Sequence, residues 1–223
     1  MINKKTYMRK HSSFTDRIIY TNRIKIVKII YDYFKNQKLK SILDIGSTND
    51  ENESSNIIIK KLKIFNEFRT ISDQEITDSF FKKKLIKSIT ENLSEREIRN
   101  FKSDVVISNA TIEHVGSTKK QIKMCENMIK LSKKYFIIIT PNRLHPLEFH
   151  TKIPLIHWIP KKLHRKILKF FGFYFLPKEQ NLNLLTKNDL INFMKKLKQK
   201  KYYFFHIRFL LFKSNIILIG KKI

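Results

Sequence analysis

Two short apolar segments in the middle of the chain, 104–108 and 135–140, each end abruptly in polar residues. Such segments predict buried strands, and the interior of a strand would not accommodate the polar side chains that follow them. Parallel sheets bind their ligands at the carboxyl ends of their strands. We therefore expect any chemistry of this protein around residues 108–114 and 140–150.

Glu113 and His114 follow the first of these segments. A histidine titrates near neutral pH and can take a proton from a hydroxyl, amine or carboxyl group, which makes His114 a candidate catalytic base. Glu113 could orient this ring or contact a substrate. The alternative is a structural pair, in which the glutamate bonds backbone amides and the histidine packs under the loop.

Segment 141–160 holds four of the five prolines of the chain. Proline fixes φ and removes a hydrogen-bond donor, so a rigid loop is predicted here. The Arg143 guanidinium, with Asn142 beside it, could hold a carboxylate or a phosphate of a substrate. His145 and His150 are candidate bases, and the alternative is a structural corner. We expect no metal, because the histidine spacings match no familiar ligand pattern and no cysteine joins them.

Acidic residues also stand at the ends of two earlier apolar segments. Asp44 and Gly46 close the predicted strand 41–45, and Asp73 follows the predicted strand 67–72. A carboxylate at a strand end can accept hydrogen bonds from both hydroxyls of a ribose, as it does in dinucleotide-binding folds. The alternatives are an ordinary Asp-x-Gly turn and an aspartate that caps a turn or a helix.

Alternating helices and strands must position these residues. Five segments are predicted to be helices: 15–36, 53–65, 119–134, 161–171 and 186–199. Five segments are predicted to be strands: 41–45, 67–72, 85–89, 104–108 and 135–140. The last two apolar segments, 202–212 and 214–220, favour an antiparallel hairpin joined by the tight FKSN connection. This order predicts an α/β doubly wound fold.

The chain has 223 residues, a net charge of +27 and 42% hydrophobic residues, which is enough for one domain with a real core. The charge could serve a polyanionic partner, either nucleic acid or an anionic membrane. The alternative, which we favour, is compositional drift. Lysine supplies 37 of the 46 basic residues, these lysines are spread along the whole chain, and alanine occurs once.

Segment 161–171 is basic and amphipathic, with Leu163, Ile167, Phe170 and Phe171 on one face. It could dock on an anionic membrane, although an amphipathic helix that lies on its own domain is the favoured alternative. No apolar segment approaches the roughly 18 residues of a membrane span, and the N-terminus has no apolar secretory segment. The single cysteine excludes an internal disulfide, and we expect a cytoplasmic protein.

Four segments together resemble class I S-adenosylmethionine-dependent methyltransferases of the type 11 kind. SILDIGS (41–47) resembles the first strand and the cofactor loop of that family, and SDVVISNATIEHVG (103–116) is similar to its fourth-strand motif. SNIILIG (214–220) resembles the last strand, which inserts antiparallel to the rest. TPNRLHPLEFHTKIPLIHWIP (140–160) resembles one branch of the family. The resemblance covers roughly residues 40–220 and implies a Rossmann-like, mainly parallel sheet.

The resemblance implies S-adenosyl-L-methionine as the cofactor. Six residues are then expected to contact it: Asp44, Gly46, Ser47, Asp73, Asn109 and Ala110. Asp44 would attract the methionine ammonium and Asp73 would bind the ribose, and Ser88 or Thr90 is a weaker candidate near the adenine. Because the chain has Thr48 where the family has a further glycine, a non-catalytic methyltransferase-like protein stays an alternative.

The sequence thus predicts a single methyltransferase domain over 1–223, with the segment 141–180 covering the substrate. The expected reaction transfers a methyl group to a small-molecule, lipid-linked or saccharide acceptor by in-line displacement. Alignment and exclusion of water would supply most of the acceleration. Besides the non-catalytic reading, the remaining alternative is a nucleic-acid methyltransferase, which the net charge alone suggests.

Overall fold

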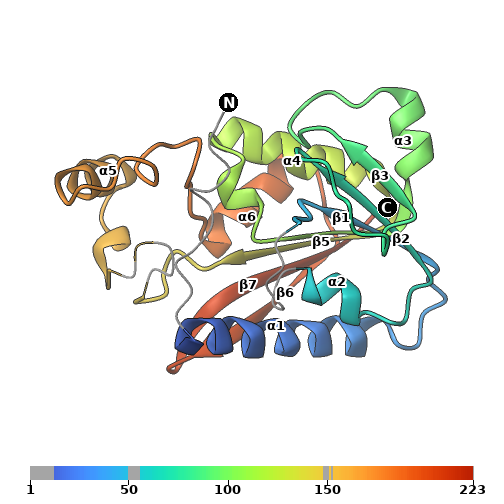
Figure 1. Cartoon of the computed structure of the whole chain (residues 1–223), viewed down its shortest axis with the longest axis horizontal. Coiled ribbons are helices and arrows are strands. Elements are labelled where there is room, and N and C mark those ends of the chain that lie inside the picture. The colour runs from blue at the N-terminus through green and yellow to red at the C-terminus, as the bar shows by residue number, and fades with distance from the viewer. Residues whose placement is uncertain (1–12, 50–55, 148–150, 152, 223) are drawn as a thin grey trace.

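A twisted seven-stranded sheet forms the centre of the computed structural model, which describes residues 13–49, 56–147, 151 and 153–222 (Figure 1). The strands are β1 (Ser41–Ile45), β2 (Glu67–Ser72), β3 (Lys83–Ile86), β4 (Ser103–Asn109), β5 (Ser132–Pro141), β6 (Tyr202–Phe209) and β7 (Phe212–Lys221). Their order is β3-β2-β1-β4-β5-β7-β6. β7 runs antiparallel to both of its neighbours, and the other neighbouring pairs are parallel.

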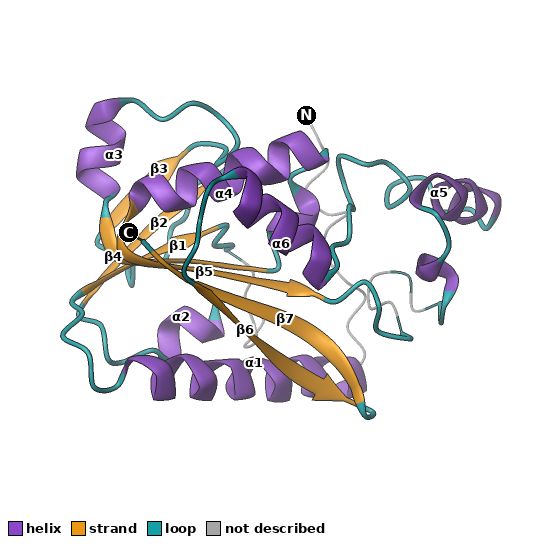
Figure 2. Cartoon of the chain, turned by 180° about the vertical axis from the view of Figure 1, so that it is seen from behind, coloured by secondary structure: helices purple, strands orange, loops and turns teal. Residues whose placement is uncertain are grey.

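Helices cover both faces of this sheet (Figures 1 and 2). They are α1 (Ser13–Phe34), α2 (Ile57–Lys61), α3 (Glu95–Phe101), α4 (Thr118–Leu131), α5 (Lys161–Phe170) and α6 (Lys187–Lys196), with the short 3-10 helices η2 (Ile112–His114) and η3 (Ile156–Trp158). α1 and α2 lie on one face, and α3, α4 and α6 lie on the other. The predicted α/β doubly wound class, with an antiparallel strand near the C-terminus, is confirmed.

Burial on both faces of the sheet explains why the central strands appear in the sequence as nearly continuous apolar runs. Successive side chains of a strand point to opposite faces. Ile137 and Ile139 of β5 belong to the core under α1 and α2, whereas Phe136 and Ile138 belong to the core under α4 and α6. Since helices bury both faces, most positions in the interior of such a strand are apolar.

The third strand differs from its predicted position. β3 spans Lys83–Ile86, whereas the sequence predicted a strand around 85–89. β3 lies at the edge of the sheet, pairs only with β2 and keeps Lys83, Lys84 and Ile86 exposed. An edge strand of this kind buries little apolar surface, so it has no apolar run by which a sequence reading could find it. The apolar residue that suggested the later position, Ile89, is buried in the loop that follows.

The C-terminal hairpin is confirmed, but its turn is not the predicted FKSN connection. The turn is formed by Leu210 and Leu211, with φ of 48° and 68°, and residues 212–215 belong to β7. Positive φ at both central positions is the type I′ turn of two-residue hairpins, which favours Asn and Gly. A pair of leucines gives no such signal, and only the pairing of β6 with β7 places the turn there.

The helix predicted over 53–65 is shorter in the structure. α2 begins at Ile57 and ends at Lys61, and residues 50–55 lie outside the described part of the chain.

The start of α6 agrees with the sequence, which predicted that Thr186 caps this helix. The Thr186 hydroxyl accepts a hydrogen bond from the backbone N–H of Asp189, and the Asp189 carboxylate accepts one from the N–H of Thr186.

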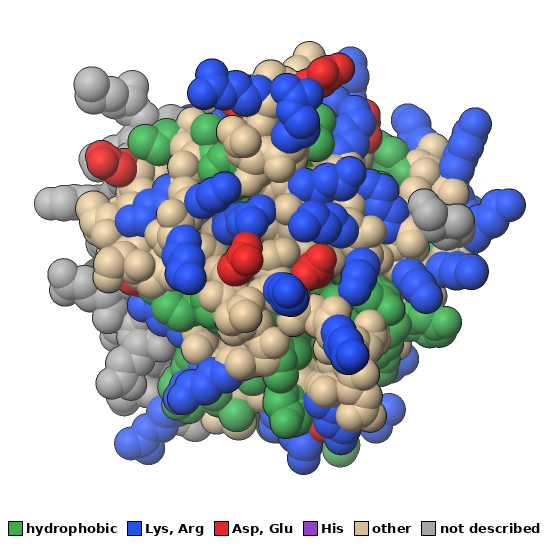
Figure 3. Space-filling model, turned by 90° about the vertical axis from the view of Figure 1, so that its right-hand side faces the viewer, with side chains coloured by type: hydrophobic (Ala, Val, Ile, Leu, Met, Phe, Trp, Pro, Cys, Tyr) green, Lys and Arg blue, Asp and Glu red, His purple; other side chains and the backbone are tan. Residues whose placement is uncertain are grey.

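Basic residues are dispersed over one end of the molecule. Figure 3 views the end of the molecule opposite α5, and lysines and arginines are scattered over it between neutral side chains. They do not gather in one stripe on this face. None of the helices in the described ranges is long and apolar enough to cross a bilayer.

Gly220 provides a test of the packing between β5 and β7. It pairs with Phe136, and an added Cβ would lie 2.0 Å from the end of that aromatic ring. Gly220→Ala should therefore lower the free energy of unfolding by about 2 kcal/mol, measured by urea denaturation. The double variant Gly220→Ala/Phe136→Leu should recover part of this loss. A double variant that loses the sum of both single effects would contradict the contact.

Candidate functional site

The carboxyl ends of β1, β2 and β4 meet at one edge of the sheet. Ile45 of β1 pairs with Ile71 of β2 on one side and with Ser108 of β4 on the other. The residues that come next, Gly46 and Asn109, therefore lie side by side at this edge. Asp73 follows the end of β2 and is exposed. The structure thus brings the three predicted strand ends together.

A buried polar network forms the turn after β1. The Ser47 hydroxyl donates a hydrogen bond to Asp44 Oδ2 over 2.5 Å and accepts one from the Thr70 hydroxyl over 2.7 Å. Ser72 Oγ donates to the Ser47 carbonyl over 2.9 Å. All four side chains are buried. Burial raises the pKa of Asp44 to about 6, while hydrogen bonds and the positive charge of Arg23 lower it in part.

Gly46 is required by its backbone and by its neighbour Thr111. Its φ is +90°, and an added Cβ would lie 2.4 Å from Thr111 Oγ1. The same hydroxyl donates a hydrogen bond to the Ile45 carbonyl over 3.2 Å. Thr111 thus joins the turn after β1 to the turn after β4. The sequence reading missed this residue, because nothing in its local pattern marks it.

The turn after β4 contains Ala110, the only alanine of the chain, with φ of 53°. Its N–H donates to the Ile139 carbonyl of β5 over 2.9 Å. A small side chain suits this left-handed backbone better than a bulky one. The hydroxyl of Ser108, one residue before the end of β4, is buried and has no hydrogen-bond partner among the described residues.

Glu113 is fully buried beside the end of β5. Its Oε2 accepts a hydrogen bond from the Thr140 hydroxyl over 2.9 Å, and its backbone carbonyl accepts one from the Asn183 N–H over 2.7 Å. Its other carboxylate oxygen, Oε1, is buried without a hydrogen-bond partner in the part of the chain that the structure describes. A buried oxygen of this kind can receive a hydrogen bond from a ligand.

His114 is half-buried, and its Nδ1 lies 2.6 Å from the backbone carbonyl of Asn181. A carbonyl oxygen only accepts, so Nδ1 carries the proton of this contact. In the neutral ring, Nε2 is then the basic nitrogen. Residues 181–183 are thereby attached to η2, which follows β4.

The side chains of Gln121 and Asn183 add further hydrogen bonds between residues 181–183 and the segment around η2. Gln121 Nε2 donates to the carbonyls of Ile112 and Asn183 over 3.1 and 2.8 Å. Asn183 Nδ2 donates to the Gly116 carbonyl over 2.9 Å. Neither residue was expected at the site. The alternating asparagines and leucines of residues 181–185 are the signal that could have found the second one.

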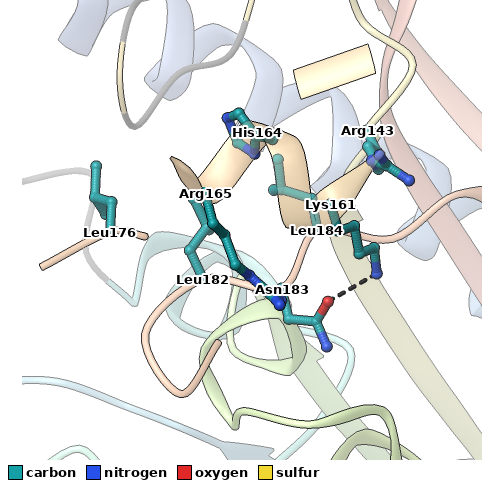
Figure 4. A pocket seen from close by; sticks show the side chains of 8 residues that line it. All are labelled: Arg143, Lys161, His164, Arg165, Leu176, Leu182, Asn183 and Leu184. Atoms are coloured by element: carbon teal, nitrogen blue, oxygen red, sulfur yellow. Dashed lines mark hydrogen bonds between the residues drawn. The ribbon is translucent and has the colours of Figure 1, made fainter. Parts of the chain in front are cut away.

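A small, partly open hollow lies between α5 and this segment (Figure 4). Its lining residues are Arg143, Lys161, His164, Arg165, Leu176, Leu182, Asn183 and Leu184. Lys161 and Arg165 extend toward Asn183, and Lys161 Nζ donates to Asn183 Oδ1 over 2.7 Å. Arg165 lies 3.6 Å from Glu179. Burial lowers the pKa of Lys161, so this ammonium is poorly hydrated.

Arg143 mainly ties the proline-rich segment together. Its Nε donates to the His157 carbonyl over 3.1 Å, and its Nη2 donates to the Ile159 carbonyl over 2.8 Å. Burial lowers the pKa of its guanidinium. The side chain also lines the hollow, so the structure places it beside Lys161.

Asn142 and His145 contact the β6–β7 hairpin. Asn142 Nδ2 donates to the Lys213 carbonyl over 2.8 Å, and Asn142 Oδ1 accepts from the Leu144 N–H over 3.1 Å. His145 is buried, with its ring nitrogens 2.9 and 3.2 Å from the carbonyls of Leu147 and Phe209. These contacts agree with a structural role for this segment, which the sequence analysis gave as the alternative to a loop that contacts the substrate. His150, the third candidate base, lies outside the described residues.

Ser88 and Thr90 follow β3, and their hydroxyl oxygens lie 2.9 Å apart. Asn127 of α4 donates to the carbonyl of Ile89 between them over 2.6 Å. These contacts hold the loop against α4.

Within the described residues, no three histidine, cysteine, aspartate or glutamate side chains gather as a metal site would require.

No protein-family model and no curated protein matches the chain. Solved structures do. The magnesium protoporphyrin IX methyltransferase of Synechocystis PCC 6803, with bound S-adenosylmethionine, has a TM-score of 0.57 and 10% identity, over 98% of this chain and 88% of that one. The 1,6-didemethyltoxoflavin-N1-methyltransferase of Burkholderia thailandensis has a TM-score of 0.56 and 8% identity, over 91% of this chain and 79% of that one.

The N-methyltransferase NodS of Bradyrhizobium japonicum WM9, in complex with S-adenosylhomocysteine, has a TM-score of 0.52 and 8% identity, over 90% of this chain and 86% of that one. Identities this low concern the fold. Nearly the whole chain takes part in the likeness, and the sheet has the antiparallel strand that the resemblance implied. The chain therefore has the fold of the class I S-adenosylmethionine-dependent methyltransferases.

Proposed function

We propose that this protein transfers a methyl group from S-adenosyl-L-methionine to a small-molecule acceptor that carries an anionic group. The observation that carries this proposal is the shared edge of β1, β2 and β4, where the buried Asp44 carboxylate of β1 accepts a hydrogen bond from Ser47 in the turn that contains Gly46. In doubly wound folds the ligand binds outside such strand ends. The bound cofactors of the solved structures with this fold support the choice of ligand.

The residues of this edge fit the proposed cofactor. Asp44 is a dehydrated carboxylate with a raised pKa, and a nearby cation such as the methionine ammonium would favour its charged form. Asp73 is exposed beside this edge, where its two oxygens could accept hydrogen bonds from the ribose hydroxyls. We assign the remaining contacts to Gly46 and Ser47 after β1 and to the Asn109–Ala110 turn after β4.

When bound, S-adenosyl-L-methionine supplies a methyl group on a sulfonium that is a good leaving group. The protein then has mainly to align the acceptor and to exclude water. We propose that His114 removes a proton where the acceptor has one to lose, because η2 places it directly after β4, at the edge to which we assign the cofactor. We assign His145 to holding the loop, since its ring is buried against backbone carbonyls. The role of His150 stays a prediction.

The cationic hollow favours an acceptor with a carboxylate or a phosphate. Lys161 and Arg165 converge on Asn183, whose N–H donates a hydrogen bond to the Glu113 carbonyl in η2. Partial burial removes water from Lys161, and a bound anion would offset that cost. We propose that residues 141–180 cover this acceptor and that the unpartnered oxygen of Glu113 receives a hydrogen bond from it.

Nucleic acid remains the alternative acceptor, because of the net charge of +27. On the end of the molecule that Figure 3 shows, opposite α5, the cations do not gather along one groove as they would on a surface that tracks a nucleic-acid backbone. A nucleic-acid methyltransferase would bind polynucleotides with an affinity that falls steeply with salt.

The cytoplasmic location of the protein stays a prediction.

Calorimetry with S-adenosylhomocysteine tests the proposed cofactor site. We expect micromolar affinity for the natural chain and a strong loss in Asp44→Asn, because the amide cannot carry the negative charge. Asp104→Asn is the matched control. Asp104 also lies in a strand of this sheet, but it accepts hydrogen bonds from the N–H groups of Lys40 and Ser41 near the opposite end of β1 and β4. Absent binding, or an equal loss in both variants, would refute the assignment.

A further inference from the structure

The region around α5 carries large apolar side chains that are exposed in the described part of the chain. Phe170 is 87% exposed, Phe171 is 61% exposed and Tyr174 is 77% exposed, all within five residues. Trp158 and Leu163, which lie nearby in the chain, are each 48% exposed. Isolated exposed apolar residues are ordinary, whereas a dense group of them indicates an interaction surface.

The exposed residues of α5 are sorted around the helix axis. α5 buries His164 and Leu168 against the protein. At 100° per residue, Leu163 and Phe170 point to nearly the same direction, away from the buried pair. Next to them, Lys162, Lys166 and Lys169 form a second row, and all three are exposed. A helix with an apolar row beside a lysine row has the composition of helices that lie in the surface of a membrane.

A second exposed apolar group lies at the same end of the molecule. α5 extends from the body of the protein there, and the tip of the β6–β7 hairpin lies at that end in both views (Figures 1 and 2). At the tip, Leu210 is 68% exposed and Leu211 is 94% exposed. The exposed cations Arg208 and Lys213 flank them. This tip repeats the chemistry of α5, with apolar residues between basic ones.

We infer that the protein binds the surface of an anionic lipid bilayer through the outer face of α5, with residues 170–174, and through the tip of the β6–β7 hairpin. Apolar side chains would enter the boundary between headgroups and acyl chains, and the lysine row would contact anionic headgroups. The apolar side chains and the lysine row of this surface then each have a partner of matching chemistry.

Other partners would match either the charged or the apolar side chains of this surface, but not both. A second copy of the chain would bring a net charge of +27 against the same charge, which opposes association. A nucleic acid would neutralise the lysines, but it would leave Leu210 and Leu211 without an apolar partner. An anionic bilayer satisfies the charges and the apolar side chains together.

Such binding would also place the cationic hollow near the membrane. Lys161, His164 and Arg165 of α5 line that hollow. A lipid-linked acceptor could then reach it from the bilayer, a consequence that rests on the proposed function. The membrane binding itself does not, because it needs neither cofactor nor acceptor.

Vesicle co-sedimentation tests this inference with the full chain and no cofactor. We expect binding to vesicles of phosphatidylcholine and phosphatidylglycerol, and none to phosphatidylcholine alone. Phe170→Ser/Phe171→Ser should weaken the binding about tenfold, because two aromatic side chains no longer enter the bilayer. Lys162→Gln/Lys166→Gln/Lys169→Gln should weaken it similarly. Ile86→Ser is the matched control, since Ile86 is 60% exposed on the edge strand β3, away from α5, and its loss should change nothing.

Three results would overturn the inference. The first is equal binding to neutral and anionic vesicles. The second is a loss in Ile86→Ser as large as the loss in the phenylalanine variant. The third is a natural chain that is dimeric by light scattering and becomes monomeric in Phe170→Ser/Phe171→Ser, which would make this surface an interface between copies. An unchanged urea denaturation curve of the phenylalanine variant would show that its fold is intact. Because this control needs no cofactor, a failure of the membrane inference stays distinguishable from a failure of the proposed function, which calorimetry with S-adenosylhomocysteine tests separately.

Discussion

Gly46→Ala is expected to abolish detectable binding of S-adenosylhomocysteine and to lower the free energy of unfolding by about 3 kcal/mol. Two physical effects add at this residue. The backbone has a φ of +90°, which residues with a Cβ rarely adopt, and the new methyl group would lie 2.4 Å from Thr111 Oγ1. To relieve the overlap, the turn after β1 or the turn after β4 must move, and these are the turns to which we assign the cofactor. Calorimetry and urea denaturation measure the two effects.

Gly172 offers a matched control for the backbone effect. Its φ is +79°, close to that of Gly46, but nothing lies within 4 Å of an added Cβ. Gly172→Ala should therefore cost only the backbone strain, about 1 kcal/mol, and should leave cofactor binding unchanged. Gly46→Ala/Thr111→Ala should recover part of the stability lost in Gly46→Ala. If Gly46→Ala and Gly172→Ala lose equal stability, the contact with Thr111 is unimportant.

The second large effect is a pH dependence caused by Asp44. Its pKa is raised from the usual 3.8 to about 6 by burial, so the folded protein holds this proton more tightly than the unfolded chain does. The contribution of Asp44 to stability is then greatest below about pH 4 and is lost as the pH rises to about 6. Between these limits the natural chain should lose about 3 kcal/mol relative to Asp44→Asn, which cannot ionise. Urea denaturation of both proteins across this range measures the difference.

Cofactor binding should have the opposite pH dependence. If the Asp44 carboxylate attracts the methionine ammonium, binding needs the ionised form. The affinity of S-adenosylhomocysteine should then be about tenfold weaker at about pH 5 than at about pH 7, because its own amino and carboxyl groups do not titrate in this range. Asp44→Asn should bind weakly with little pH dependence. A natural chain whose affinity does not change with pH would place the ammonium away from Asp44.

Much of the sheet could be predicted from the chain itself. The bounds of β1 and β2 are those expected from the sequence, and β4 and β5 contain the predicted segments. Their apolar residues are adjacent in the sequence, and helices on both faces require such runs. The cap of α6 was predictable for a similar reason, since Thr186 and Asp189 lie three residues apart and form a local motif.

The candidate site was predictable only where it follows strand ends. The convergence of Gly46, Asp73 and Asn109 follows from the rule that parallel strands end at one edge. The contact between Gly46 and Thr111 does not, because it joins residues 65 positions apart. The same holds for Asn183, whose bonds to Gln121 and Gly116 depend on how the chain returns after α5.

The sequence by itself determined the fold class, the strands of the sheet interior and the edge at which a ligand would bind. These features follow from the apolar periodicity of single segments and from the order of helices and strands along the chain, and both depend on residues that are close in the sequence. Only the tertiary structure decided which side chains at that edge are buried, that His145 faces the hairpin and that Phe170 and Phe171 at the end of α5 face outward. The physical reason is that burial and the hydration of a charge depend on the segments that pack around a residue, and those segments are distant in the sequence.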